Sequence, residues 1–167
     1  MIRRFRDYDI ERVVDIWLEG NVSAHGFISA DYWIDNAGFF RQVVHEMDVY
    51  VYEQMGSVVG FVAVDQNQIA ALYVVAPYRD KGLGKQFVEY IKNMRDTLSL
   101  QVYQKNHKAI DFFHREGFFI DDEAINPDTG ELEFTMCWFK CPPLDEERIL
   151  RVVRGRKKEH DVLLDSV

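Results

Sequence analysis

The chain of 167 residues has the length of one ordinary domain, and its 47% hydrophobic content is enough to build a core. Its 20 Lys and Arg are outnumbered by 28 Asp and Glu, and this formal charge of −8 argues against a nucleic-acid-binding protein, which needs a basic face. No stretch approaches the ~18 uninterrupted apolar residues of a membrane span, and the charged N-terminal segment has no apolar signal core. We therefore expect a cytoplasmic protein with no nucleic-acid or membrane partner.

The N-terminal part predicts one short strand and two helices. Residues 2–6 alternate apolar and charged side chains, as a half-buried strand does. A helix with one apolar face follows and is expected to end at Gly20, which leaves a loop before a second helix over 30–44. The aromatic residues of this region are expected to lie mostly in the core: Phe27, Tyr32, Trp33, Phe39 and Phe40.

The middle of the chain continues with strands and helices in alternation. An antiparallel meander is predicted, with a helix, a strand, a helix and a final strand pair after it. The predicted ranges are 48–53, 58–64 and 68–75 for the meander, then 85–95, 99–103, 108–115, 118–125 and 132–139. The order β-α-α-β-β-β-α-β-α-β-β indicates a mixed α/β fold with a sheet flanked by helices.

The composition of the chain changes in its C-terminal residues. Pro142 and Pro143 break the last strand, and the charged, helix-prone segment that follows makes residues 141–167 an appended tail on a domain of residues 1–140. Its apolar residues are expected to dock on the domain itself or on a second copy, as in a homodimer. The two cysteines, Cys137 and Cys141, have no zinc-ligand set around them, so we expect reduced thiols and no metal.

The segment from Leu72 to Lys85 carries the clearest chemistry, because a strand there runs into a glycine-rich turn that opens a helix. Such a turn directs successive backbone N–H groups at one point, where anions bind. Gly82 and Gly84 lack the Cβ atoms that would block a diphosphate. The spacing fits neither a dinucleotide fingerprint nor a P-loop. Taken alone, the two glycines are also compatible with a plain strand-to-helix turn.

Two motifs together resemble the GCN5-related N-acetyltransferase (GNAT) family. The first is R-x-x-G-x-G from Arg79 to Gly84, which resembles the family's acetyl-CoA pyrophosphate loop. The second is the segment from Asn106 to Phe118, which resembles the family's N-x-x-A-x-x-F-Y-x-x-x-G-F pattern, with Phe113 at the tyrosine position. The resemblance covers roughly residues 2 to 140.

The resemblance implies a sheet that splays apart around acetyl-CoA as cosubstrate. It implies that the backbone of Tyr73, Val74 and Val75 pairs with the pantetheine arm, and that Asn106 lies near the thioester, with Phe112 and Phe113 beside the cofactor. The pyrophosphate is expected on the loop and the first helical turn: Arg79, Asp80, Lys81, Gly82, Leu83, Gly84 and Lys85.

A narrower resemblance concerns the acceptor. Small bacterial GNAT proteins, some of them proposed to acetylate protein lysines, carry H-x-F-I after the first helix, here His25 to Ile28. This implies transfer of the acetyl group to a primary amine, either a protein lysine or a small molecule. Phe27 and Trp33 are the residues expected to floor the acceptor pocket.

The family's usual proton-handling residues are missing. Phe113 replaces the tyrosine that serves as acid for the leaving thiolate, and Gln68 stands where histone-type members have a glutamate base. His25 is the candidate base and Tyr103 the candidate acid, although each is also compatible with a purely packing role. These replacements motivate a second hypothesis, that of a catalytically silent acyl-CoA-binding sensor.

Overall fold

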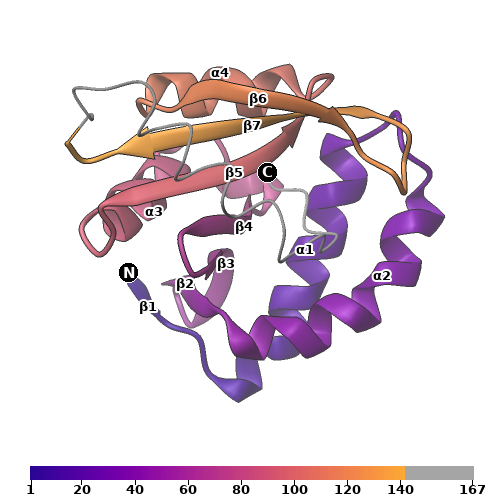
Figure 1. Ribbon diagram of the computed structural model, residues 1–167. Helices are drawn as coiled ribbons and strands as arrows, with labels where there is room; N and C mark the ends of the chain where they lie inside the picture. The colour runs from indigo at the N-terminus through magenta and orange to yellow at the C-terminus, as the bar shows by residue number, and fades with distance from the viewer. Residues whose placement is uncertain (142–167) are drawn as a thin grey trace.

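The computed structural model describes residues 1–141 (Figure 1). The tail predicted at 141–167 falls outside these residues except for Cys141, so its docking stays a prediction. The described elements follow the predicted order: β1 (Ile2–Arg4), α1 (Ile10–Ala24), α2 (Ala30–Val43), β2 (Asp48–Gln54), β3 (Ser57–Asp65), β4 (Gln68–Val74), α3 (Leu83–Lys92), β5 (Thr97–Tyr103), α4 (His107–Arg115), β6 (Phe119–Ile125) and β7 (Leu132–Phe139). Short 3-10 turns lie at Asp7–Asp9, Val44–Glu46 and Ala76–Tyr78.

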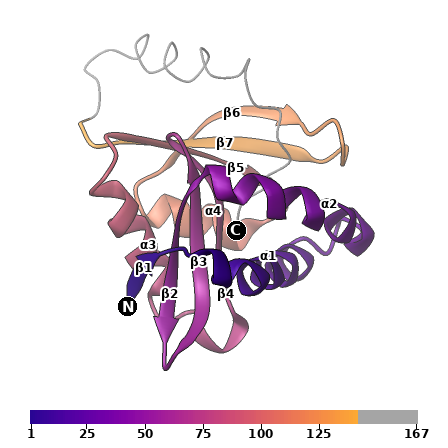
Figure 2. The ribbon, with the colours of Figure 1, turned by 90° about the horizontal axis from the view of Figure 1, so that it is seen from below.

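The seven described strands form one sheet in the order β1-β2-β3-β4-β5-β7-β6. All neighbours are antiparallel except β4 and β5. Figures 1 and 2 show α1 and α2 on one face of the sheet and α3 and α4 on the other. Each face has its own apolar core, one with buried side chains of α1 and α2 and the other with those of α3 and α4. The predicted mixed α/β class is confirmed.

Strands β4 and β5 touch only at their starts. Their parallel register holds at Gln68 with Ser99 and at Ile69 with Leu100, and it stops there. Beyond Ile69 the two strands diverge, and Figure 1 shows β5, β7 and β6 running across the direction of the meander. The backbone of β4 from Leu72 onward therefore has an edge that β5 does not cover.

Helix α1 is longer than predicted. It continues through Gly20 to Ala24, although a glycine often ends a helix. At Gly20 the helix packs closely on β4, because a Cβ there would lie 2.2 Å from the Tyr73 ring. The Tyr73 ring therefore packs directly on the helix backbone at Gly20. Its hydroxyl donates to Asn21 Oδ1 at 2.6 Å.

The aromatic residues of α2 divide between core and surface. Trp33 and Phe40 are buried against Trp17 of α1, and the Trp17 and Phe40 rings stack at 4.7 Å. Phe39, which was expected in the core, is exposed, because it lies one position off the buried stripe of the helix. The core of this face therefore rests on fewer aromatic side chains than the sequence suggested.

Three further observations concern residues 1–141 only. No helix there is long and apolar enough to cross a membrane. No three His, Cys, Asp or Glu side chains in this part of the chain gather as metal ligands would. Burial raises the pKa of the Cys137 thiol to about 12, whereas Cys141 is exposed, and neither forms a disulfide.

Candidate active site

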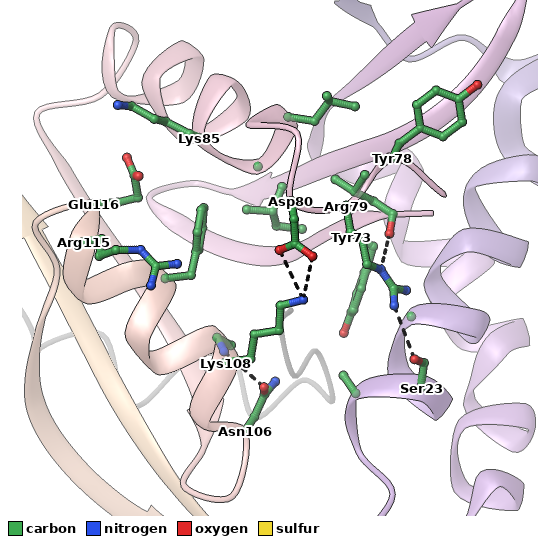
Figure 3. Close-up of a pocket in the computed structure, with 18 of the residues that line it drawn as sticks. Ser23, Tyr73, Tyr78, Arg79, Asp80, Lys85, Asn106, Lys108, Arg115 and Glu116 are labelled. Atoms are coloured by element: carbon green, nitrogen blue, oxygen red, sulfur yellow. Dashed lines mark hydrogen bonds and ion pairs between the residues drawn. The ribbon is translucent and has the colours of Figure 1, made fainter. Parts of the chain in front are cut away.

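A cavity of about 760 Å³ opens where β4 and β5 separate (Figure 3). Its walls come from α1, from β4, from the loop and first turn of α3, and from α4 with the turn before it. The lining residues are Gly20, Ser23, Ala24, Leu72, Tyr73, Val74, Tyr78, Arg79, Asp80, Gly82, Leu83, Gly84, Lys85, Lys105, Asn106, His107, Lys108, Ala109, Phe112, Arg115 and Glu116.

The wall of this cavity is basic although the chain as a whole is acidic. Five of its side chains are Lys or Arg and two are Asp or Glu. One of the two acids, Asp80, forms an ion pair across the opening with Lys108 of α4, at 3.4 Å (Figure 3). A cavity with this balance of charge attracts an anionic ligand.

Helix α3 directs its N-terminus at the cavity. Its N-cap, Gly82, has φ +82°, a left-handed conformation that L side chains rarely adopt. A Cβ on Gly84 would lie 3.2 Å from the Phe112 ring of α4, so this glycine lets the two helices approach closely. The first N–H groups of a helix have no intrahelical acceptor and carry a partial positive charge. The helix N-terminus and the two glycines therefore have the arrangement that an anion site needs, and anion binding here stays a prediction.

The backbone of β4 presents alternate residues to the cavity. Val75 donates its N–H to the Val59 carbonyl oxygen at 2.9 Å, so Val75 and Tyr73 direct their backbone groups toward β3. Val74 then directs its own toward the uncovered edge, and Val75 does not line the cavity. Of the three residues expected to pair with an added strand, Val74 has the required orientation.

The cations of the glycine loop have different surroundings. Arg79 lines the cavity but anchors the loop, because its Nε donates to the Val74 carbonyl oxygen at 2.7 Å and its Nη1 to Ser23 Oγ at 3.4 Å (Figure 3). Lys81 lies outside the lining, with its ammonium 5.5 Å from the centre of the Tyr78 ring. Lys85, in the first turn of α3, lines the cavity.

The second motif builds the opposite wall. Asn106 caps α4, its Oδ1 accepting the Ala109 N–H at 3.2 Å. Its Nδ2 lies 3.3 Å from Nε2 of His25, and both side chains are buried. Phe112 lines the cavity, whereas Phe113 is fully buried and packs on Phe118 in the core. Phe113 therefore has no surface at the cavity.

Comparison with known proteins agrees with this geometry. A family profile described as "Acetyltransferase (GNAT) domain" matches residues 45–119. The chain is 33% identical over 140 residues to Peptidyl-lysine N-acetyltransferase YiaC of Escherichia coli (strain K12), covering 83% of this chain and 96% of that protein. The chain belongs to the GCN5-related N-acetyltransferase (GNAT) family. It is accordingly an enzyme that transfers the acetyl group of acetyl-CoA to an amine, and nothing found favours the silent sensor.

Two solved structures show the same GNAT fold. The solution structure of apo YjaB from Escherichia coli has a TM-score of 0.73 at 24% identity, over 83% of this chain and 96% of that one. An aminoglycoside 6'-N-acetyltransferase complexed with coenzyme A has a TM-score of 0.66 at 13% identity, over 87% of this chain and 99% of that one. At these identities the likeness concerns the fold alone.

The residues present fit acetyl-CoA as the GNAT cosubstrate. The basic wall and the N-terminus of α3 suit a phosphorylated ligand, and the uncovered edge at Val74 suits a chain that adds to the sheet. When bound, acetyl-CoA supplies the activated acetyl group. The cofactor role of each residue stays a prediction.

The expected proton-handling residues lie in an aromatic cluster beside the cavity. His25 and Tyr103 are fully buried, their rings 5.1 Å apart, and neither lines the cavity. Trp33 stacks on His25 at 5.2 Å, and the Phe27 ring lies 5.5 Å from Tyr103. Burial lowers the pKa of His25 to about 4. Neither Phe27 nor Trp33 is part of the cavity wall, so their role at an acceptor site stays a prediction.

Several lining residues were not predicted from the sequence. Helix α4 and the turn before it contribute five charged or titratable side chains in addition to Asn106, namely Lys105, His107, Lys108, Arg115 and Glu116. The signal that could have found them is their spacing along the second motif, because residues three, four and seven apart on a helix share a face, as Lys108, Phe112 and Arg115 do. Gln68, at the family's usual base position, does not line the cavity.

Proposed function

We propose that this enzyme acetylates the ε-amino group of lysine residues in proteins. The observation that carries the proposal is the 33% identity to a peptidyl-lysine N-acetyltransferase along 96% of that relative's length. A second relative, Peptidyl-lysine N-acetyltransferase YjaB of Escherichia coli (strain K12), is 28% identical over 131 residues, 78% of this chain and 89% of that protein. The acidic net charge of −8 suits a cationic acceptor.

The proposed arrangement divides the site between the two motifs. The α3 N-terminus with Gly82 and Gly84 holds the diphosphate, Val74 pairs with the pantetheine arm, and Asn106 lies at the thioester end. Tyr103 is the proposed donor to the departing thiolate, because the residues that follow it on the chain, from Lys105 onward, line the cavity.

The test uses purified enzyme, acetyl-CoA and a peptide with a blocked N-terminus and one lysine. We expect release of free thiol and an acetylated lysine by mass spectrometry. The matched control is the same peptide with arginine in place of lysine, which keeps the charge but offers no acylable amine. Turnover with spermidine but with no lysine peptide would move the acceptor to the small-molecule class.

We further propose that His25 acts through Asn106 rather than as the base. With Asn106 Oδ1 occupied by the Ala109 N–H, the amide Nδ2 faces Nε2 of His25, which must then be the acceptor. The neutral ring required for this agrees with a pKa lowered to about 4 by burial. His25 thereby fixes the orientation of Asn106.

Two substitutions of His25 separate positioning from packing. His25→Phe keeps a ring against Trp33 but removes the acceptor, so we expect kcat/KM for acetyl-CoA to fall about tenfold, the value of one hydrogen bond. His25→Gln restores an acceptor and should recover part of this loss. Because the pKa of His25 is about 4, its ring is already neutral at pH 6 to 7, so the pH profile in this range should keep its shape in both variants. A profile that loses its acid limb in His25→Phe would instead identify His25 as the base.

A further inference from the structure

Strand β7 contains a buried carboxylate that forms no ion pair with any side chain among residues 1–141. Glu133 is 7% exposed, and its Oε2 has no hydrogen-bond partner among residues 1–141. Burying a charged group without a partner is costly, so such a group needs an explanation. Lys105, the first cation after β5, pairs with Glu131 at 2.9 Å.

The register of the sheet places this carboxylate beside the aromatic cluster. Glu133 lies directly opposite Tyr103 in the antiparallel pair of β5 and β7, and Gln104 N–H donates to the Leu132 carbonyl oxygen at 2.9 Å. Residues directly opposite in such a pair share a face, with Cβ atoms about 5 Å apart. Glu133 therefore projects toward the side of α1 and α2, where Tyr103 meets His25 and Phe27.

This face borders the cavity near the end of β5, where His25 lies 3.3 Å from Asn106 of the cavity wall. The residues just after Tyr103 line the cavity, among them Asn106 at the proposed thioester end. Glu133 does not itself line the cavity, but its position opposite Tyr103 puts it at the same end of β5. Its other strand neighbour, Ala124 of β6, has a small side chain and leaves room beside it.

We infer that Glu133 binds the ammonium group of the acceptor and accepts its proton. The inference rests on the proposed function, because it requires an amine acceptor at this site. Of the titratable or charged groups on the neighbouring elements, Tyr103 lies directly opposite Glu133 and His25 lies against Tyr103. Lys105 and Glu131, each two residues along the chain from this pair, bind each other, and Asp122 of β6 lies opposite Thr135, two residues after Glu133. Lys105 is paired and His25 is neutral, so the acceptor ammonium supplies the positive charge that Glu133 lacks.

The chemical step then balances in protons and electrons. The ammonium gives one proton to the Glu133 carboxylate and becomes a neutral amine, whose nitrogen lone pair forms a bond to the acetyl carbonyl carbon. The C–S bond breaks, and its electron pair stays on sulfur. The second proton leaves the nitrogen and ends on the thiolate, which gives the amide and free coenzyme A. The proton on Glu133 passes to solvent after product release.

The substitution Glu133→Gln tests this assignment, since it removes the charge and keeps the shape. With the blocked lysine peptide at pH 7, we expect kcat/KM to fall about 10²-fold, the usual value of a positioned base, with unchanged acetyl-CoA affinity by calorimetry. Near pH 10 the deficit should shrink below about tenfold, because lysine, with a pKa of about 10.4, then loses its proton to water. The matched control, Glu123→Gln on the exposed part of β6, should behave as wild type.

Thermal unfolding gives a readout that distinguishes this role from a structural one. Since the apo protein gains nothing from an unpaired buried charge, Glu133→Gln should unfold at the wild-type temperature or above it. Wild-type kcat/KM in Glu133→Gln, or a lower melting temperature together with a deficit that does not depend on pH, would overturn the inference. If the wild-type enzyme acetylates spermidine but no lysine peptide, the proposal of a lysine acceptor fails. The role of Glu133 is then tested by comparing kcat/KM of wild type and Glu133→Gln with spermidine as the acceptor.

Discussion

Replacing Gly82 with aspartate should abolish acetyl-CoA binding while leaving the fold intact. Gly82 caps α3 in a left-handed conformation with φ +82°, and a Cβ there would meet no atom within 4 Å. Aspartate and asparagine tolerate this conformation better than other non-glycine residues. The new carboxylate would lie at the helix N-terminus, where the proposed diphosphate must be held, and would repel it.

The matched variant is Gly82→Asn, which has the same shape without the charge. We expect no measurable binding for Gly82→Asp and only about tenfold weaker binding for Gly82→Asn by calorimetry, with similar melting temperatures for both. An equal loss in the two variants would mean that side-chain volume, not anion repulsion, is responsible. Wild-type affinity in Gly82→Asp would place the diphosphate elsewhere.

The fold was predictable where a local pattern decides the structure. The meander strands are confirmed to within two residues, because their apolar alternation and the turns between them are local signals. The end of α1 was not predicted, since the contact that requires a glycine at position 20 is with Tyr73, far along the chain. No local signal distinguishes such a glycine from one that ends a helix.

The site residues also fall into those that a local motif predicts and those whose position depends on distant contacts. The glycine turn and Asn106 belong to contiguous motifs, and the structure brings both to one cavity. His25 was expected in an open loop, whereas aromatic rings from α2 and β5 enclose it. Glu133 was missed because its position opposite Tyr103 depends on the register of β5 and β7, which alternation alone does not fix.

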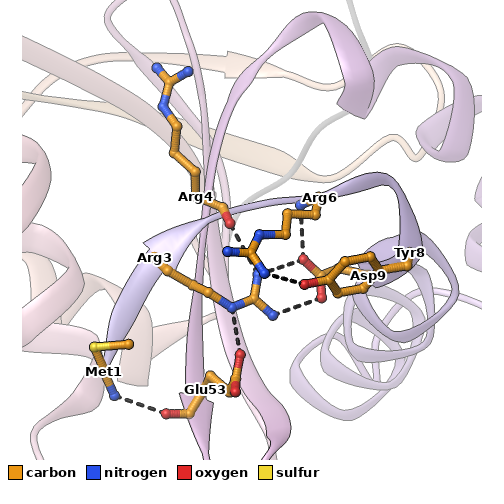
Figure 4. Close-up of polar contacts among 7 residues, drawn as sticks. All are labelled: Met1, Arg3, Arg4, Arg6, Tyr8, Asp9 and Glu53. Carbon is orange, nitrogen blue, oxygen red and sulfur yellow. Dashed lines mark hydrogen bonds and ion pairs between the residues drawn. The ribbon is translucent and has the colours of Figure 1, made fainter.

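Replacing Arg3 with methionine should destabilise the protein more than any surface substitution. Arg3 joins β1 to the start of α1 through two hydrogen bonds to Asp9, at 2.8 and 2.9 Å, and its Nε donates to Glu53 Oε2 at 2.5 Å (Figure 4). The Asp9 side chain is 4% exposed and also accepts the Arg6 N–H at 2.8 Å. Removing one partner of a buried pair leaves the other charge uncompensated, which costs about 3 to 5 kcal/mol.

The measurement is the free energy of unfolding in urea at pH 7, with Arg4→Met as the control, because Arg4 is largely exposed and should be replaceable without measurable loss. The double variant Arg3→Met with Asp9→Asn removes the stranded charge and should recover part of the stability. If Arg3→Met unfolds at the same urea concentration as the wild type, the Arg3–Asp9 pair makes no net contribution to the free energy of unfolding.

The pH dependence of the unfolding free energy tests whether the lost ion pair causes this destabilisation. Burial opposes the ionisation of Asp9, but the hydrogen bonds from Arg3 and Arg6 outweigh it and lower its pKa. A carboxyl group with a lowered pKa stabilises the fold above its unfolded value of about 3.9, and this contribution disappears as pH falls through the folded pKa. Without Arg3, Asp9 keeps only the Arg6 contribution against the opposing effect of burial, so its protonated form is favoured more than in the wild type. Acidification then relieves the variant while it weakens the wild type. The difference in unfolding free energy between wild type and Arg3→Met should therefore shrink steadily from pH 7 to pH 3, whereas a loss of packing alone would leave it constant.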